Sequence, residues 1–177
     1  MEELEQFMGR ARRRPLFRAD ELSVKLDCGR PGIERMLPHR GGFLLLDRIV
    51  ATDGSARQAL GRRRLDPNDP VFADHFPGDP VYPGVLLVEM MGQLALTLPA
   101  LGDGAPRAEQ PPRVRFIRLH DARFIGAALP GDELTVLAEL IDDNGYTFLA
   151  GGQVMRGAEI LAAAVFEALL LEGDEND

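Results

Sequence analysis

Apolar residues run almost without interruption from residue 85 to residue 98, and only Glu89, Gly92, Gln93 and Thr97 break the run. A helix that is apolar on nearly all sides belongs in a protein core. Glu89, Gln93 and Thr97 follow the spacing i, i+4 and i+8, so they form a narrow polar stripe on one face of that helix. A buried carboxylate is costly unless it has a partner or is protonated. The stripe therefore indicates a functional site.

Strand-like runs flank this helix on both sides. Residues 43–50 and 57–65 predict a hairpin, because the turn residues 52–55 join them. Between the hairpin and the helix, five prolines in residues 66–83 prevent regular structure. A loose segment, Pro99 to Pro112, follows the helix, and then come four more predicted strands: Val114 to Phe124, Glu133 to Ile141, Thr147 to Met155 and Ile160 to Leu171. We expect an α+β fold in which a curved antiparallel sheet wraps around the helix, although the pattern also allows other α+β sheets.

Residues 1–30 precede this pattern as an N-terminal extension whose role the sequence does not reveal. The extension predicts one side of a short helix, formed by Leu4, Phe7, Met8 and Ala11, and a strand-like alternation at Leu22, Val24 and Leu26. Pro31 and Gly32 then break the chain, and residues 33–37 predict a short helix that ends before Pro38. At 177 residues the protein is long enough for one core, so we expect a single domain over residues 31–177.

The formal net charge of −8 and the pI near 4.9 argue against nucleic acid as the main partner, because the phosphate backbone selects for basic surfaces. Basic residues nevertheless occur in clusters. These are Arg10 with Arg12, Arg13 and Arg14; Arg62 with Arg63 and Arg64; and Arg113 with Arg115 and Arg118. Such clusters usually keep a surface soluble.

The single cysteine, Cys28, excludes an intrachain disulfide and a cysteine-rich metal site. The first residues are acidic and lack the apolar stretch of a secretory signal. The apolar helix is shorter than the roughly 20 residues that span a bilayer. We therefore expect a cytoplasmic protein without a membrane span.

A proline-rich loop places His75 fourteen residues ahead of Glu89. An unperturbed imidazole has a pKa near 6.5, so this side chain is a candidate general base. Pro83 and Gly84 stand where the helix begins, and the first amides of a helix have no intrahelical acceptors. Because Gly84 has no side chain, a carbonyl oxygen could approach its N–H closely.

This region resembles the hot-dog-fold 3-hydroxyacyl-[acyl-carrier-protein] dehydratases, particularly the FabZ type. The matching motifs are His75-Phe76-Pro77-Gly78, Pro80-Val81, Pro83-Gly84-Val85-Leu86, Glu89 and Gln93, together with Leu37-Pro38-His39-Arg40, Phe43-Leu44-Leu45-Leu46-Asp47-Arg48, Ala122-Arg123-Phe124 and Pro130-Gly131-Asp132. FabA-type relatives carry aspartate in place of Glu89. The resemblance covers roughly residues 33 to 171.

The resemblance implies dehydration of (3R)-3-hydroxyacyl thioesters, carried on an acyl carrier protein, to trans-2-enoyl thioesters. His75 would be the base, Glu89 the acid and the Gly84 N–H the carbonyl donor, while Gln93 would orient Glu89. Burial should raise the pKa of Glu89, and a nearby imidazolium would oppose that shift. In the family, the histidine and the acid of one site come from different subunits of a dimer, and some members assemble three dimers. No cofactor is implied, and the acidic carrier could dock on an arginine cluster.

Two departures from the family pattern, together with the extension at residues 1–30, leave a specialised pathway, such as polyketide or other secondary lipid assembly, open beside housekeeping fatty-acid synthesis. Asp74 stands where FabZ-type enzymes usually have glycine, and it could raise the pKa of His75. Gly41 and Gly42 replace a common Tyr-Pro pair and should loosen their loop.

Two other functions remain open at this point. One is a hot-dog thioesterase that hydrolyses the same thioester, and the other is a non-catalytic acyl-binding protein. A metal site is not indicated, because His39, His75 and His120 lack ligand spacing. We interpret His39 as structural.

Overall fold

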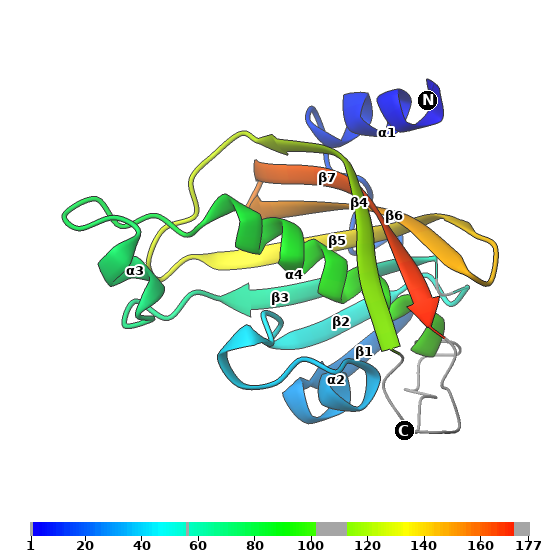
Figure 1. Cartoon of the computed structure of the whole chain (residues 1–177), viewed down its shortest axis with the longest axis horizontal. Helices are drawn as coiled ribbons and strands as arrows, with labels where there is room; N and C mark the ends of the chain where they lie inside the picture. Colours follow the sequence, from blue (N-terminus) through cyan, green and yellow to red (C-terminus); the bar gives the residue numbers. More distant parts are fainter. Residues whose placement is uncertain (1, 56, 102–112, 172–177) are drawn as a thin grey trace.

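The computed structural model describes residues 2–55, 57–101 and 113–171, and it contains one seven-stranded antiparallel sheet (Figure 1). The strands lie in the order β1-β2-β3-β5-β6-β7-β4. Their bounds are β1 Val24–Gly29, β2 Arg48–Thr52, β3 Gln58–Arg64, β4 Arg113–Phe124, β5 Glu133–Asp143, β6 Thr147–Arg156 and β7 Glu159–Leu171. The helices are α1 Glu2–Ala11, α2 Arg30–Met36, α3 Val71–Asp74 and α4 Gly84–Leu96, with 3₁₀ turns η1 Gly41–Phe43 and η2 Leu98–Ala100.

The apolar helix α4 lies against the inner face of the sheet, as the sequence predicts (Figure 1). Its fully buried side chains Met90, Met91 and Leu94 join inward-facing residues of the strands in the main core. Gly152 on β6 allows the closest approach, because a Cβ there would lie 2.6 Å from the Cβ of Met91. A curved antiparallel sheet around a central helix is the hot-dog fold, so the predicted architecture is confirmed.

A second apolar cluster covers the outer face of the same sheet, where the N-terminal extension packs. Phe7, Met8 and Ala11 of α1 contact outward-facing side chains of the strands. Strand β7 shows the consequence for the sequence: Ala162 and Ala164 face the main core, while Ala163 and Val165 face the extension. Because apolar side chains cover both faces of the sheet at β7, its sequence is a continuous apolar run and does not alternate between apolar and polar residues.

The buried amide of Gln153 fastens the extension to the sheet. Its Oε1 accepts a hydrogen bond from the Leu16 N–H at 3.2 Å. Its Nε2 donates to the carbonyl of Arg14 at 3.0 Å and to that of Ala11. Because Gln153 is fully buried, these bonds satisfy every polar group of a side chain that would otherwise be costly in the core.

Three local predictions are wrong. Pro31 and Gly32 do not break the chain, because they lie in the first turn of α2, which begins at Arg30 and ends at Met36. The strand that was predicted from residue 43 begins only at Arg48. Residues 41–43 form η1, and several backbone groups of residues 41–45 hydrogen-bond to side chains and not to a neighbouring strand. The proline-rich segment is not wholly irregular, since α3 forms one turn at residues 71–74. Much of the loose segment that was predicted between Pro99 and Pro112 lies outside the described residues.

In the described ranges, none of the helices is both long enough and apolar enough to cross a bilayer.

We predict that Gln153→Leu lowers the free energy of unfolding by about 2 kcal/mol. The change leaves buried backbone groups of residues 11–16 without partners, at a cost of roughly 1 to 3 kcal/mol. Urea denaturation measures the loss. The control is Gln58→Leu, because the Gln58 side chain is only partly buried and bonds to Glu139 at 3.3 Å. Equal stability losses in the two variants would contradict the role of the buried amide.

Candidate active site

His75 lines a pocket of about 500 Å³ at the start of α4. The chain after α3 turns at residues 76–79, where the backbone N–H of Asp79 donates to the Phe76 carbonyl at 3.0 Å. The Val81 N–H then donates to the His75 carbonyl at 2.9 Å. This closed loop holds the imidazole at the pocket wall. The pocket is lined by His75, Val81, Tyr82, Pro83, Gly84, Val85, Leu87, Phe124, Ile125, Gly126 and Ala127.

Within the described ranges, the imidazole of His75 has one polar contact, between Nδ1 and the Val81 carbonyl oxygen at 2.8 Å. A carbonyl can only accept, so Nδ1 carries a proton and donates it. In the neutral ring Nε2 is then unprotonated, and it has no hydrogen-bond partner in the described chain. An imidazole with this tautomer is arranged to accept a proton at Nε2.

Gly84 lines the same pocket as His75 and is the first residue of α4. A Cβ at this position would lie 2.8 Å from two ring atoms of Phe124, so any larger residue would have to displace that ring. The structure thus brings together two of the residues predicted from sequence. A thioester carbonyl in this pocket would face the positive end of a helix of 13 residues.

Glu89 lies farther along α4 and does not line the His75 pocket. Its Oε1 is 3.2 Å from Nε2 of His39 and accepts a hydrogen bond from Nε2 of Gln93 at 2.9 Å. Sequence reasoning missed the first of these partners, since it assigned His39 a structural role. The only signal was the position of His39 in a motif shared with the family.

The expected direction of the Glu89 pKa shift is wrong. Desolvation by burial does raise the pKa of this carboxyl, but hydrogen bonds from His39 and Gln93, and the charge that His39 carries when protonated, outweigh it. The pKa therefore lies below the ordinary value of 4.5. In the isolated chain Glu89 is a carboxylate at neutral pH.

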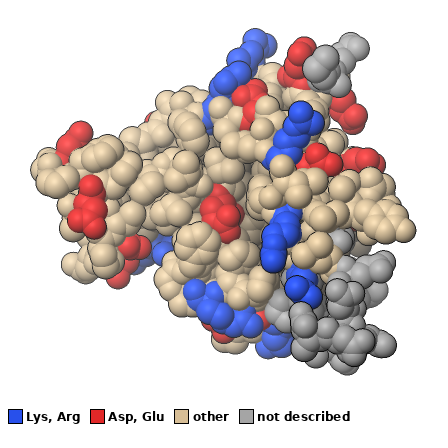
Figure 2. All heavy atoms as spheres, viewed as in Figure 1, with Lys and Arg blue, Asp and Glu red and all other residues tan. Residues whose placement is uncertain are grey.

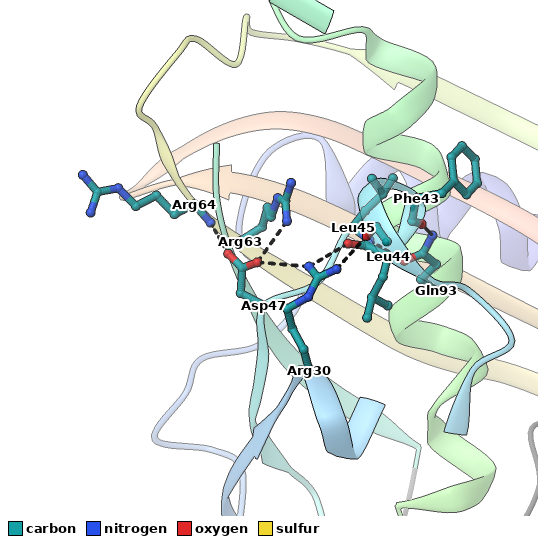
Figure 3. Close-up of polar contacts among 9 residues, drawn as sticks. Arg30, Phe43, Leu44, Leu45, Asp47, Arg63, Arg64 and Gln93 are labelled. Carbon is teal, nitrogen blue, oxygen red and sulfur yellow. Dashed lines mark hydrogen bonds and ion pairs between the residues drawn. The ribbon is translucent and has the colours of Figure 1, made fainter. Parts of the chain in front are cut away.

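Gln93 connects Glu89 to the loop between α2 and β2. Figure 3 shows its contacts with that loop. It is fully buried, as the polar stripe predicts. Its Oε1 accepts from the Leu45 N–H at 2.8 Å, and its Nε2 donates to the Phe43 carbonyl at 2.8 Å. Thr97, the third residue of the stripe, bonds instead to the Leu94 carbonyl of its own helix at 2.7 Å.

The same loop is held at its other side by Arg30 (Figure 3). The Arg30 guanidinium donates to the carbonyls of Gly41 at 2.7 Å and Leu44 at 3.0 Å, and it lies 3.6 Å from the Asp47 carboxylate. Asp47 also forms an ion pair with Arg63 at 2.9 Å. The two glycines at 41 and 42 were expected to loosen this loop, but these contacts tie it on both sides.

His75 and Glu89 do not touch each other in the described chain, where neither a hydrogen bond nor an ion pair joins them. The structure thus forms two groups, His75 with Gly84 and Glu89 with His39 and Gln93. Asp74 was expected near His75, but within the described residues it forms no ion pair with the imidazole.

Other candidate residues take structural positions. His120 lies 3.3 Å from the Glu167 carboxylate. Arg63 is mostly buried in its ion pair with Asp47 and is not available for docking, whereas Arg64 extends away from the fold (Figure 3).

Among the described side chains, no group of three or more His, Cys, Asp or Glu residues could hold a metal ion.

Comparisons with known proteins agree with this arrangement. Residues 37–164 match the FabA-like domain. The chain is 35% identical over 140 residues to the 3-hydroxyacyl-[acyl-carrier-protein] dehydratase FabZ of Roseobacter denitrificans, covering 78% of this chain and 90% of that protein. It is 37% identical over 133 residues to the FabZ of Pelotomaculum thermopropionicum, covering 75% and 91%.

Solved structures show the fold. An uncharacterized protein from Pyrococcus horikoshii superposes with a TM-score of 0.57 at 18% identity, covering 87% of this chain and 99% of that one. The dehydratase heterocomplex ApeI:P from Xenorhabdus doucetiae gives a TM-score of 0.51 at 20% identity, covering 64% and 88%. Together with the sequence relatives, these comparisons show that the chain belongs to the FabA-like family and, within it, to the FabZ 3-hydroxyacyl-[acyl-carrier-protein] dehydratases.

Proposed function

We propose that this protein dehydrates (3R)-3-hydroxyacyl-[acyl-carrier-protein] thioesters to trans-2-enoyl thioesters in fatty-acid or related lipid synthesis. The observation that carries the proposal is the combination of FabZ membership with His75, whose Nδ1 bonds to the Val81 carbonyl and leaves Nε2 free. Hydro-lyase chemistry needs a base with a free nitrogen beside a carbonyl-binding donor. Both groups line one pocket.

The proposed elimination uses three groups. Nε2 of His75 removes the proton next to the thioester carbonyl, while the Gly84 N–H stabilises the negative charge that develops on the carbonyl oxygen. The C–H electron pair forms the new double bond, the C3–O bond breaks, and Glu89 protonates the departing hydroxyl to give water. Afterwards His75 holds one more proton and Glu89 one fewer, so a proton must return to Glu89 between turnovers.

Glu89 must be protonated to act as the acid, although it is a carboxylate in the isolated chain. A bound acyl chain and a second subunit would exclude water from its surroundings. Burial already acts to raise the pKa of Glu89, although the hydrogen bonds outweigh it in the isolated chain. Further burial strengthens this contribution and moves the pKa upward, as the reaction needs. The proton is then shared by a coupled pair, His75 and Glu89.

We also propose that the working enzyme is a homodimer in which His75 of one chain faces Glu89 of the other. Strand β4 is an edge of the sheet, and it exposes Phe116, Ile117 and Leu119 by 42 to 51%. An apolar edge strand invites pairing with another chain. Pairing two β4 strands makes one continuous sheet and brings two α4 helices together.

A cytoplasmic location agrees with the single cysteine.

The acyl carrier protein is the proposed second partner. Figure 2 shows basic side chains in a row over β4, whereas acidic side chains mark the end of the molecule that carries α3. The loop around α3 contains four aspartates, Asp66, Asp69, Asp74 and Asp79. An acidic carrier would be repelled there and attracted by the β4 arginines. We therefore propose docking over Arg115 and Arg118, whose side chains are exposed in the single chain. Pairing through β4 uses the backbone edge, and side chains project from the faces of the sheet, so this docking surface adjoins the proposed dimer seam.

The first prediction concerns the acid and the base: His75→Asn and Glu89→Gln each reduce kcat by at least about a hundredfold. Asparagine can still donate to the Val81 carbonyl, and glutamine keeps an acceptor for Gln93, so folding should be unchanged. Appearance of the enoyl thioester measures turnover, and mass spectrometry detects any free acid from hydrolysis. Near wild-type dehydration in either variant, or free acid as the main product, would overturn the assignment.

Mixing the two inactive variants tests the shared site. After subunit exchange, half of the mixed dimers' sites combine an intact His75 with an intact Glu89, so part of the activity should return. Exchange is verified with differently tagged chains. Inactivity of proven mixed dimers would place both residues of a site in one chain.

We predict that Gly84→Ala lowers kcat/KM by roughly tenfold or more, because a Cβ would intrude where the carbonyl must approach the amide. Gly92→Ala is a matched control, since its Cβ would lie 2.6 Å from the ring of Phe116, outside the His75 pocket. Both variants must shift an aromatic ring of β4. Equal losses of kcat/KM would attribute the Gly84 effect to packing alone.

For the carrier, we predict that reversing Arg115 and Arg118 to glutamate raises the apparent KM for carrier-bound substrate about fivefold or more. Exposed ion pairs contribute about 0.2 to 1 kcal/mol each, so two reversals are needed. Activity on a small thioester analogue should stay nearly constant. Reversal of Arg12 and Arg13, an exposed pair on the N-terminal extension, is the control. Equal losses of activity on the carrier-bound substrate and on the small analogue would mean that the two arginines support folding or dimer formation and do not dock the carrier.

A further inference from the structure

Glu89 receives both of its described hydrogen-bonding contacts on one oxygen. Nε2 of His39 lies 3.2 Å from Oε1, and Nε2 of Gln93 lies 2.9 Å from the same atom. Oε2 has no partner among the described residues, and it is not one of the buried unpaired atoms, so it reaches accessible space. The two carboxyl oxygens are therefore chemically different before any substrate binds.

The orientation of the Gln93 amide follows from its surroundings. The backbone N–H of Leu45 can only donate, so it must face the Gln93 Oε1. The two hydrogens of Nε2 are then directed to the Phe43 carbonyl and to Oε1 of Glu89. Glu89 Oε1 must accept from Gln93, because no other arrangement satisfies this buried amide.

The His39 side chain is mostly buried, at 18% exposed, and its ring stacks on Phe43 at 6.2 Å between centroids. Its Nδ1 is fully buried and has no hydrogen-bond partner among the residues that the structure describes. A carboxylate oxygen can only accept a hydrogen bond. The neutral ring therefore carries its proton on Nε2 and directs it to Oε1 of Glu89, 3.2 Å away.

We propose that His39 is a positioning residue which, together with Gln93, directs the catalytic proton of Glu89 to Oε2. An oxygen that accepts two hydrogen bonds takes the role of the carbonyl oxygen of a carboxylic acid. The acidic proton then resides on Oε2, the oxygen that is free to face the substrate. When Oε2 gives this proton to the departing hydroxyl, the charge left on the carboxylate is stabilised at Oε1 by the two donors.

This inference rests on the proposed dehydratase function, but its geometry does not depend on the substrate. Glu89 is the only ionisable side chain of α4. In the described chain, His39 is also the only ionisable group in hydrogen-bonding contact with it. A change at His39 should therefore be detectable at Glu89 whether or not the enzyme is turning over.

The test compares His39→Gln with His39→Phe. The glutamine amide can place a donor near the position of Nε2, whereas phenylalanine keeps the ring stacked on Phe43 and removes the donor. We expect His39→Phe to lower kcat by roughly 10- to 100-fold, as misplacement of a reacting group does, with KM within about threefold of wild type. His39→Gln should recover most of the kcat.

The second measurement is a ¹³C NMR titration of the Glu89 carboxyl in the full-length protein, assigned with Glu89→Gln. Wild-type Glu89 should titrate below pH 4.5, the ordinary value. His39→Phe should raise the pKa, because desolvation then acts with one hydrogen bond fewer to oppose it. His39→Gln should give a smaller rise, since it keeps the hydrogen bond and loses only the charge.

The outcomes are separable. Equal kcat losses in the phenylalanine and glutamine variants, or an unchanged Glu89 pKa in His39→Phe, would overturn the positioning role. Complete loss of activity in His39→Gln with a Glu89 pKa close to wild type would instead make His39 a proton-transfer group and overturn the proposal. If the wild-type protein fails to dehydrate any carrier-bound substrate, the proposed function fails, and the titration still decides the positioning role.

Discussion

The buried amide of Gln93 is the contact on which the candidate site depends. One side chain joins the central helix to the backbone of residues 43 and 45 and to the Glu89 carboxyl. A glutamine at this position is costly to bury unless all its groups are paired. Because they are paired, the loop that carries His39 has one position relative to the helix. The helix thus fixes the site as well as the core.

The overall fold was predictable because its determinants are local and periodic. The run of apolar residues identified the central helix, and alternation with turn residues identified strands β3 to β7 within one or two residues of their ends for most of them. The segment before β2 was mistaken for part of a strand. Its apolar residues 44–46 are fully or almost fully buried, but their backbone bonds to the side chains of Arg30 and Gln93. Periodicity reports burial and cannot report that kind of hydrogen-bond partner.

The candidate site was predictable only in part. The position of Glu89 on a buried face, and its proximity to Gln93, followed from helical spacing. The contact with His39 did not, because fifty residues separate the two in sequence and an irregular loop brings them together. That contact also reversed the expected pKa shift: burial was anticipated correctly, but the opposing hydrogen bonds were not. The direction of a pKa shift depends on the balance of such contributions, and sequence supplied only one of them.

The middle of the sheet is covered on both faces, by α4 on one and by the N-terminal extension on the other. Gly152 faces Met91, and its neighbour Gly151 faces the ring of Phe7 with no room for a Cβ. Successive residues of one strand are thus restricted to the smallest side chain for unrelated reasons. A larger side chain at either glycine therefore requires Met91 or Phe7, both far away in the chain, to move or become smaller. The two glycines make the fit of the N-terminal extension and the fit of the central helix depend on adjacent residues of one strand.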